Sequence, residues 1–247
     1  MSGHSHYATI KRQKESRDAQ KGQMFSKLAK EISIAVKVGG GGDVDSNYKL
    51  RVAVERAKAA NMPKDNIERA ISKALGSKER VEEVTYEGFG PAGVAVIVEA
   101  ATDNRNRTSQ EIKNLFERGG GNLSGPGSVS YNFEQIGLIV IKKENNIEDQ
   151  TLKLIELGAD DIEETQDAIE VYVKPSLVTQ IREKIELSGF KVISFEIMQR
   201  PKNVLSVDNL SDAQRVLKFL DTLNENPDVQ KVYANVDISE DILKQIS

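Results

Sequence analysis

The sequence predicts an α+β fold in three domains: a helical N-terminal domain and two ferredoxin-like α/β domains, the last inserted into a discontinuous middle domain. Two observations lead to this prediction. Apolar residues recur at helical spacing up to residue 76, and beyond residue 80 short strands alternate with helices. We expect domains at residues 1–78, at 79–134 together with 203–240, and at 135–202.

The first predicted helix, from Met24 to Val38, is amphipathic. At 100° per residue its apolar side chains share one arc, whereas Lys27, Lys30 and Lys37 fall on the opposite arc. Four glycines at 39–42 end it, because consecutive glycines lose too much backbone entropy to stay helical. The helix therefore combines a core face with a cationic face.

Two further helices complete the helical domain. Asp45 or Ser46 suits the N-cap of a helix ending near Asn61, since short polar side chains accept hydrogen bonds from the free N–H groups there. Pro63 suits the first turn of the next helix, where its missing N–H has no cost, and Gly76 ends that helix.

The middle domain is expected to form from two separated segments, each an incomplete sheet. The first should hold strands at 84–87, 94–101 and 128–133 and a helix at 109–118. The second should hold strands at 204–207 and 229–234 and a helix at 211–223. Joined, the two segments complete a sheet of four or five strands with two helices.

The block between these segments has the order strand, helix, strand, strand, helix, strand, which is the ferredoxin-like unit. Its expected elements are 138–142, 148–157, 161–164, 169–173, 177–187 and 192–197.

Charge is divided unevenly along the chain. Residues 1–80 carry 17 Lys and Arg against 9 Asp and Glu, a net charge of +8. Since the whole chain has a net charge of −4, residues 81–247 carry −12. A cationic module on an anionic body indicates an anionic partner for the module, and nucleic acid is the commonest one.

The basic excess is densest in the arm before the first helix. Extended cations can replace the counterions condensed on a phosphate backbone, and a ring can stack on a base. The alternative is a solvated helix face that Glu15 and Asp18 partly neutralise. The candidate nucleic-acid-binding residues are Tyr7, Lys11, Arg12, Lys14, Arg17, Lys21, Lys27 and Lys30.

Arg105 and Arg107 lie between a predicted strand and a helix whose N-cap we expect at Thr108 or Ser109. At that place they could hold a phosphate beside the helix N-terminus. Alternatively, they pair with Asp or Glu of the inserted domain and fix the angle between domains.

Composition excludes several other classes. The chain has no Cys, which removes disulfides, thiolate zinc sites and thiol nucleophiles, and its two histidines, His4 and His6, lack a third metal ligand nearby. The Gly-rich stretch 119–127 lacks the lysine of a phosphate loop and reads as a surface loop. No apolar run is long enough to span a membrane. We therefore expect a cytoplasmic protein that is not an enzyme, with no metal, small-molecule substrate or membrane partner.

Several stretches together resemble the YebC/PmpR family of bacterial regulators, which includes the mitochondrial translational activator of cytochrome c oxidase subunit I. The resemblance implies a three-domain α/β architecture with a helical N-terminal domain, no catalytic residues and no cofactor. The family usually shows Lys-Trp where this chain has His6-Tyr7, and His where it has Arg12. The matching stretches are Met1–Ser5, Ala8–Lys11, Phe25–Leu28, Ala60–Ala70, Tyr86–Pro91, Thr102–Thr108, Gly119–Leu123 and Gly127–Val129.

Two functions follow from the resemblance. The first is a DNA-binding transcriptional regulator, the role by which the family is generally labelled; the second is a ribosome-associated translation factor that contacts RNA. The sequence shows no helix-turn-helix with a clear recognition helix, zinc finger or basic zipper, and a body of net charge −12 is repelled by duplex DNA. Both functions therefore stay open, as does the oligomeric state.

Overall fold

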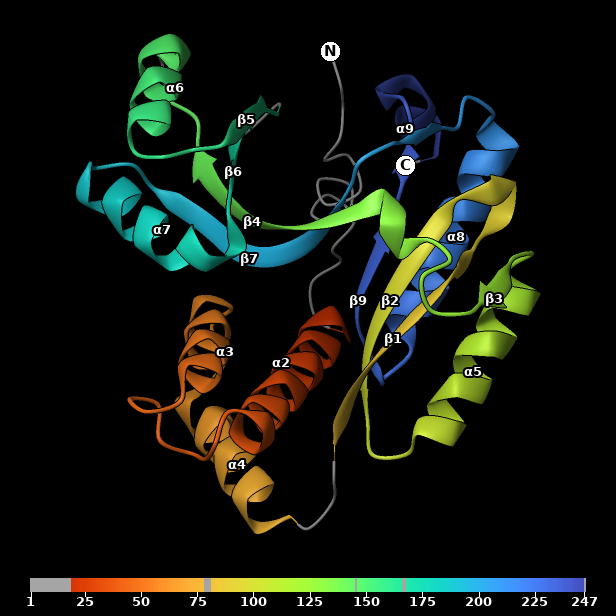
Figure 1. Cartoon of the computed structure of the whole chain (residues 1–247), viewed down its shortest axis with the longest axis horizontal. Coiled ribbons are helices and arrows are strands. Elements are labelled where there is room, and N and C mark those ends of the chain that lie inside the picture. The colour runs from red at the N-terminus through yellow and green to blue at the C-terminus, as the bar shows by residue number, and fades with distance from the viewer. Residues whose placement is uncertain (1–18, 78–80, 145, 166–167, 247) are drawn as a thin grey trace. The chain divides into compact units, whose positions relative to one another are not determined.

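The computed structural model describes residues 19–77, 81–144, 146–165 and 168–246 (Figure 1). It divides into two compact units, one made of residues up to Ser130 together with Val204 onward, the other of Tyr131–Asn203. Helices combined with antiparallel sheets confirm the α+β fold class. The three-domain boundaries stay a prediction, because the helical region and the discontinuous sheet belong to the same unit.

The first described elements of the first unit are three helices: α2 (Ala19–Val38), α3 (Tyr48–Ala59) and α4 (Lys64–Gly76). The apolar arc predicted for α2 packs against α3 and α4 in one core, in which Ile32 and Leu50 are fully buried. The helical spacing in the sequence therefore predicts this core correctly.

The N-cap of α3 is Asn47 rather than the predicted Asp45 or Ser46. The buried Asn47 side chain accepts from the N–H of Leu50 and donates to the carbonyls of Ala35 (2.8 Å) and Gly41 (2.7 Å). An amide offers both an acceptor and donors, so Asn47 satisfies both helix ends at once, which a carboxylate or hydroxyl cannot.

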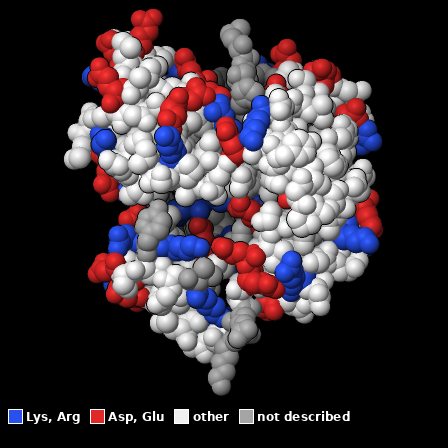
Figure 2. Space-filling model, viewed as in Figure 1, with Lys and Arg blue, Asp and Glu red and all other residues white. Residues whose placement is uncertain are grey.

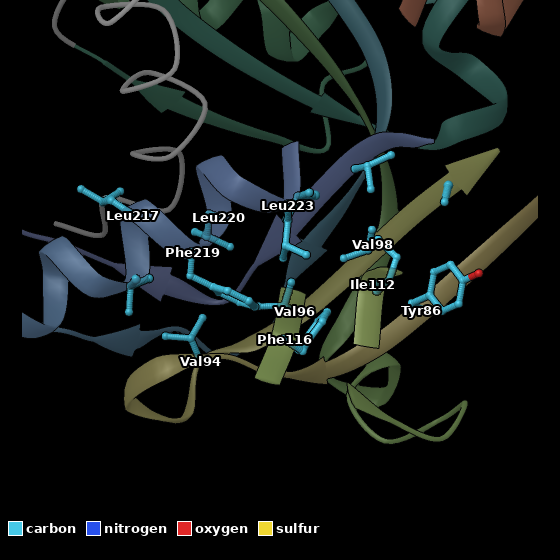
Figure 3. Packing of buried hydrophobic residues seen from close by; sticks show 14 of the residues in the cluster. Tyr86, Val94, Val96, Val98, Ile112, Phe116, Leu217, Phe219, Leu220 and Leu223 are labelled. Carbon is cyan, nitrogen blue, oxygen red and sulfur yellow. The ribbon is translucent and has the colours of Figure 1, made fainter. Parts of the chain in front are cut away.

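The sheet of the first unit has the order β3-β1-β2-β9, with antiparallel pairing throughout. Figure 3 shows side chains of α5 and α8 packed with those of β1 and β2. The rings of Phe116 and Phe219 meet edge to face, with 5.1 Å between their centroids. The elements are β1 (Glu82–Phe89), β2 (Ala95–Thr102), α5 (Arg105–Arg118), β3 (Asn122–Ser124), α8 (Leu210–Glu225) and β9 (Val229–Ala234).

The predicted union of the two chain segments is correct for β9, which pairs with β2, and wrong for residues 204–207. There β8 (Leu205–Ser206) pairs in parallel with β10 (Val236–Asp237) as a separate two-stranded sheet. Asn235 explains the separation: its side chain accepts from the N–H of Ala95, while its own carbonyl accepts from Leu205. The chain thus leaves the sheet at Asn235. A last helix, α9 (Glu240–Ile246), was not predicted.

The strand predicted at 128–133 is also wrong, because residues 130–132 form a 3₁₀ turn. The missing edge strand is β3, inside the stretch predicted to be a surface loop. Glycine is required beside it: a Cβ on Gly121 would lie 2.2 Å from the carbonyl oxygen of Phe89. Gly121 therefore serves close backbone approach rather than loop flexibility.

The second unit has the predicted ferredoxin-like order of elements, and its sheet runs β5-β6-β4-β7. Helices α6 and α7 cover one sheet face around a core that includes Ile139, Ile141 and Val171. The elements are β4 (Phe133–Lys142), α6 (Ile147–Glu156), β5 (Asp161–Glu164), β6 (Ala168–Val173), α7 (Val178–Leu187) and β7 (Val192–Pro201).

Candidate nucleic-acid interface

Two lysines of the predicted cationic face of α2 contact other parts of the first unit. Lys27 Nζ donates to the carbonyl of Asn224, in the last turn of α8, over 2.6 Å. Lys30 Nζ donates to the carbonyl of Pro227 (3.2 Å) and to the carboxylate of Asp228 (2.5 Å). The C-terminus of a helix carries partial negative charge, which favours a cation there. These two candidates therefore have protein partners in the structure.

Asp228 is the centre of a charged cluster that we call the Asp228 junction: Asp228, Lys30, Arg107 and Thr108. Asp228 is 5% exposed, and its carboxylate also accepts from Arg107 (2.9 Å) and from the hydroxyl of Thr108 (2.6 Å). Burial acts to raise the pKa of Asp228, but hydrogen bonds from Lys30, Thr108 and Arg107 outweigh it and lower the pKa to about 2. The junction joins α2, α5 and the turn before β9.

The two arginines at the start of α5 differ. Arg107 pairs with Asp103 (2.9 Å) and Asp228 (2.9 Å), which lie outside the inserted segment. The side chain of Arg105 is exposed and makes no ion pair or hydrogen bond with any described residue. The helix N-cap is Asn104, whose side chain accepts from the N–H of Arg107, rather than the predicted Thr108 or Ser109. Thr108 is buried and contributes to the Asp228 junction instead.

The remaining candidates lie in the arm or at its edge. Lys21 belongs to the first turn of α2. Five candidates fall outside the described residues: Tyr7, Lys11, Arg12, Lys14 and Arg17.

A second carboxylate missed by sequence reasoning is Glu87 on β1, which is 7% exposed. It accepts three backbone hydrogen bonds, from Gly127 (2.8 Å), Val129 (2.9 Å) and Ser130 (2.8 Å). Burial acts to raise the pKa of Glu87, and these three hydrogen bonds lower it below its ordinary value. The side chain of Ser130 is a further hydrogen-bond donor, so all donors belong to one short segment and Glu87 fixes the path of the chain after β3.

The second unit presents a different, acidic cluster. The hydroxyl of Tyr172 donates to buried Glu170 (2.8 Å), and Arg200 stacks 4.0 Å from the centre of the Tyr172 ring while pairing with Glu163 (2.6 Å). Burial and then the charges of Glu170 and Glu163 raise the pKa of Tyr172. With more carboxylates than cations, this cluster does not favour a polyanion.

Basic and acidic side chains are interspersed over the face shown in Figure 2. Within the described ranges, no three His, Cys, Asp or Glu side chains are grouped as a metal site would require. Nor does that part of the chain contain a helix long and apolar enough to cross a membrane.

Comparison with known proteins gives a consistent result over nearly the whole chain. Residues 5–77 match the model of the TACO1/YebC protein N-terminal domain, and residues 81–236 match that of the TACO1/YebC second and third domain. A protein of Dictyoglomus turgidum is 47% identical and one of Geobacter sulfurreducens 46% identical, each over all of both chains. Both are named as probable transcriptional regulatory proteins.

The fold is shared with a solved structure as well. The crystal structure of a conserved hypothetical protein from Aquifex aeolicus superposes with a TM-score of 0.84 at 42% sequence identity, covering 93% of this chain and 97% of that one. Fold, domain models and full-length relatives agree, and they confirm the resemblance seen in the sequence: the chain belongs to the TACO1/YebC family.

Proposed function

We propose that this chain is a non-enzymatic, nucleic-acid-binding regulator of gene expression, acting as a DNA-binding transcriptional regulator. The observation that carries the proposal is its full-length similarity to proteins named as probable transcriptional regulators. The net charge of +8 on residues 1–80 supplies a physical basis, since cations that displace counterions from phosphates provide most sequence-independent affinity. We place the binding in the cytoplasm and assign no cofactor.

One observation favours a second candidate, a ribosome-associated translation factor. Residues 81–247 carry a net charge of −12, so duplex DNA that extends beyond the contact patch repels this part of the chain. A short cationic module that contacts folded RNA avoids this repulsion, because it places only the module near phosphates.

Charge reversal in the arm tests the nucleic-acid contact. The variant Lys11→Glu, Arg12→Glu, Lys14→Glu should lose binding, and the slope of log K against log salt should fall by about 0.9 per lost cation on duplex DNA or about 0.7 on single strands. A matched control reverses three exposed lysines of the body, Lys153→Glu, Lys184→Glu and Lys218→Glu. An arm variant that behaves like this control would exclude the arm from the contact.

Crosslinking in cells, followed by sequencing of the recovered DNA and RNA, separates the two candidates. Enrichment of discrete promoter fragments that disappears in the arm variant supports transcriptional regulation. Enrichment of ribosomal RNA with no promoter signal, together with co-sedimentation with ribosomes, would replace it with the translation role. Recovery of neither nucleic acid would refute the proposal as a whole.

A further inference from the structure

A groove of about 310 Å³ lies between α2 and α4 in the helical region, and we call it the α2–α4 groove. It brings together side chains of α2 and α4, two helices that are separated in the sequence by α3. Its lining residues are Phe25, Ser26 and Ala29 from α2, Met62 from the preceding joint, and Asn66, Arg69, Ala70 and Lys73 from α4.

The floor of the groove is apolar and well supported. Met62 and Ala70 are buried in the helical core, and Phe25 and Ala29 pack against that core while remaining partly exposed. Phe25 and Ala29 are four residues apart and so share one face of α2. The groove therefore offers an aromatic side chain held on a firm apolar base.

The wall formed by α4 is cationic. Asn66, Arg69 and Lys73 follow each other at spacings of three and four residues, so they line one face of the helix. None of the described residues that line the groove is Asp or Glu. The α4 wall thus carries the positive charges of Arg69 and Lys73, and the α2 side of the groove carries the ring of Phe25.

No carboxylate among the described residues pairs with the side chain of either cation of this wall. Arg69 donates to the backbone carbonyl of Asp65 (3.3 Å) and to the side-chain oxygen of Asn66 (3.1 Å). The neighbouring Glu68 pairs with Lys64 at 3.5 Å instead. The side chain of Lys73 is exposed and makes no ion pair or hydrogen bond with any residue that the structure describes. The bonds to Asp65 and Asn66 orient the guanidinium while leaving other N–H groups available to an anion.

We propose that the α2–α4 groove binds an unpaired nucleotide, with the base against Phe25 and Met62 and the phosphate on Arg69 and Lys73. An aromatic ring accepts any base by stacking, while the two cations select the phosphate. In a duplex the base faces are covered by their neighbours, so the groove prefers single strands. The inference rests on the proposed nucleic-acid binding and adds a location and a strand preference to it.

Fluorescence anisotropy with the full chain tests this assignment. The probes are a labelled single-stranded oligoribonucleotide, the oligodeoxyribonucleotide of the same sequence, and its duplex, each titrated at several salt concentrations. The wall variant is Arg69→Gln with Lys73→Gln. Its matched control is Lys49→Gln with Lys58→Gln, which removes the same charge from exposed positions of α3. Phe25→Leu removes the ring but keeps an apolar side chain on the core.

The wall variant should lower the salt slope on single strands by about 1.4, at about 0.7 per cation, while the control keeps the wild-type slope. Phe25→Leu should weaken single-strand binding about tenfold, the effect of losing one stacked base, and leave duplex binding unchanged. Thermal melting monitored by circular dichroism confirms that each variant is folded. If the variants lose equal affinity for RNA and DNA single strands, the groove recognises only the base and the phosphate. If they lose affinity for RNA alone, the groove also recognises the ribose.

Three results would overturn the assignment, and the last of them would overturn the proposed function as well. If the wild type binds nucleic acid and the wall variant matches the α3 control in slope and affinity, the groove is not the site, although the proposed function stands. If Phe25→Leu and the wall variant weaken duplex binding as much as single-strand binding, the groove does not read unpaired bases. Absence of nucleic-acid binding by the wild type, with no ribosome co-sedimentation, would refute both the groove and the proposed function.

Discussion

Glu87 and Asp228 are two buried carboxylates of the same unit whose partners differ in kind. Both accept at least three hydrogen bonds, and both are less than 10% exposed. The donors to Glu87 are three backbone N–H groups and the Ser130 side chain, all of one short segment, 127–130. The donors to Asp228 are side chains, two of them charged, from α2 and α5.

The two kinds of partner indicate two structural roles. Glu87 orders one local turn, whereas Asp228 connects elements that are distant in the sequence. Backbone donors lose little further freedom when they bind, because the chain already restricts them, so Glu87 stabilises a turn at low entropic cost. Lys30 and Arg107 each lose rotamer freedom and remain partly hydrated, with side chains 25% and 45% exposed. We therefore expect Glu87 to contribute more stability and Asp228 to respond more to the solvent.

Substitution of Glu87 should have the largest effect. Glu87→Gln replaces a charge with an amide whose NH₂ group faces N–H donors, which should lower the free energy of unfolding by about 3 kcal/mol. Amide hydrogen exchange at Gly127, Val129 and Ser130 should accelerate at least about tenfold, because local opening becomes easier. Glu83→Gln, an exposed change on the same strand, is the control and should stay within about 0.5 kcal/mol. Unchanged exchange at those three amides would contradict a role for Glu87 in fixing the turn.

Substitution of Asp228 should cost less. Asp228→Asn leaves Lys30 and Arg107 without their shared carboxylate, but both can turn to water, so we expect a loss of about 1–2 kcal/mol rather than the larger cost of a fully buried orphan charge. Urea unfolding of the full chain measures it. Hydrogen exchange should accelerate in both α2 and the first turn of α5, since the junction joins them. A change confined to one of these helices would show that Asp228 does not couple them.

Neither carboxylate could be identified from the sequence, and the reason is physical. Asp228 meets Thr108 and Lys30 across 120 and 198 residues, and such pairings leave no periodic trace in one sequence. The helical and strand periods did locate most elements, and the bounds of β5 and β9 agree with the prediction. Elements of two or three residues, such as β3 and β8, were missed or misplaced because they are too short to show a period. The α2–α4 groove likewise depends on how two helices pack.

Acid unfolding should distinguish the two carboxylates by pH. Because the pKa of Asp228 in the folded chain is about 2, below its ordinary 3.8, its stabilisation is complete above about pH 4 and is lost as the pH falls towards 2. The pKa of Glu87 is also lowered, from an ordinary 4.5, so its loss begins at a higher pH. In Asp228→Asn, the decrease in the free energy of unfolding between pH 4 and pH 2 should be smaller than in the wild type. A variant with the same slope there as the wild type would argue against the junction as the source.

Salt should produce the smallest change in the free energy of unfolding, but a change that affects Asp228→Asn and not Glu87→Gln. Raising NaCl from 0.1 M to 1 M shortens the Debye length from about 10 Å to about 3 Å, which weakens attraction between partly exposed charges. The difference in unfolding free energy between wild type and Asp228→Asn should shrink by about 0.5 kcal/mol, because Lys30 and Arg107 are reached by solvent. The difference for Glu87→Gln should not change, since its donors, three backbone N–H groups and the Ser130 side chain, are uncharged. Equal responses to salt would mean that the charges of Lys30 and Arg107 add nothing beyond their hydrogen bonds, and that the two carboxylates act in the same way.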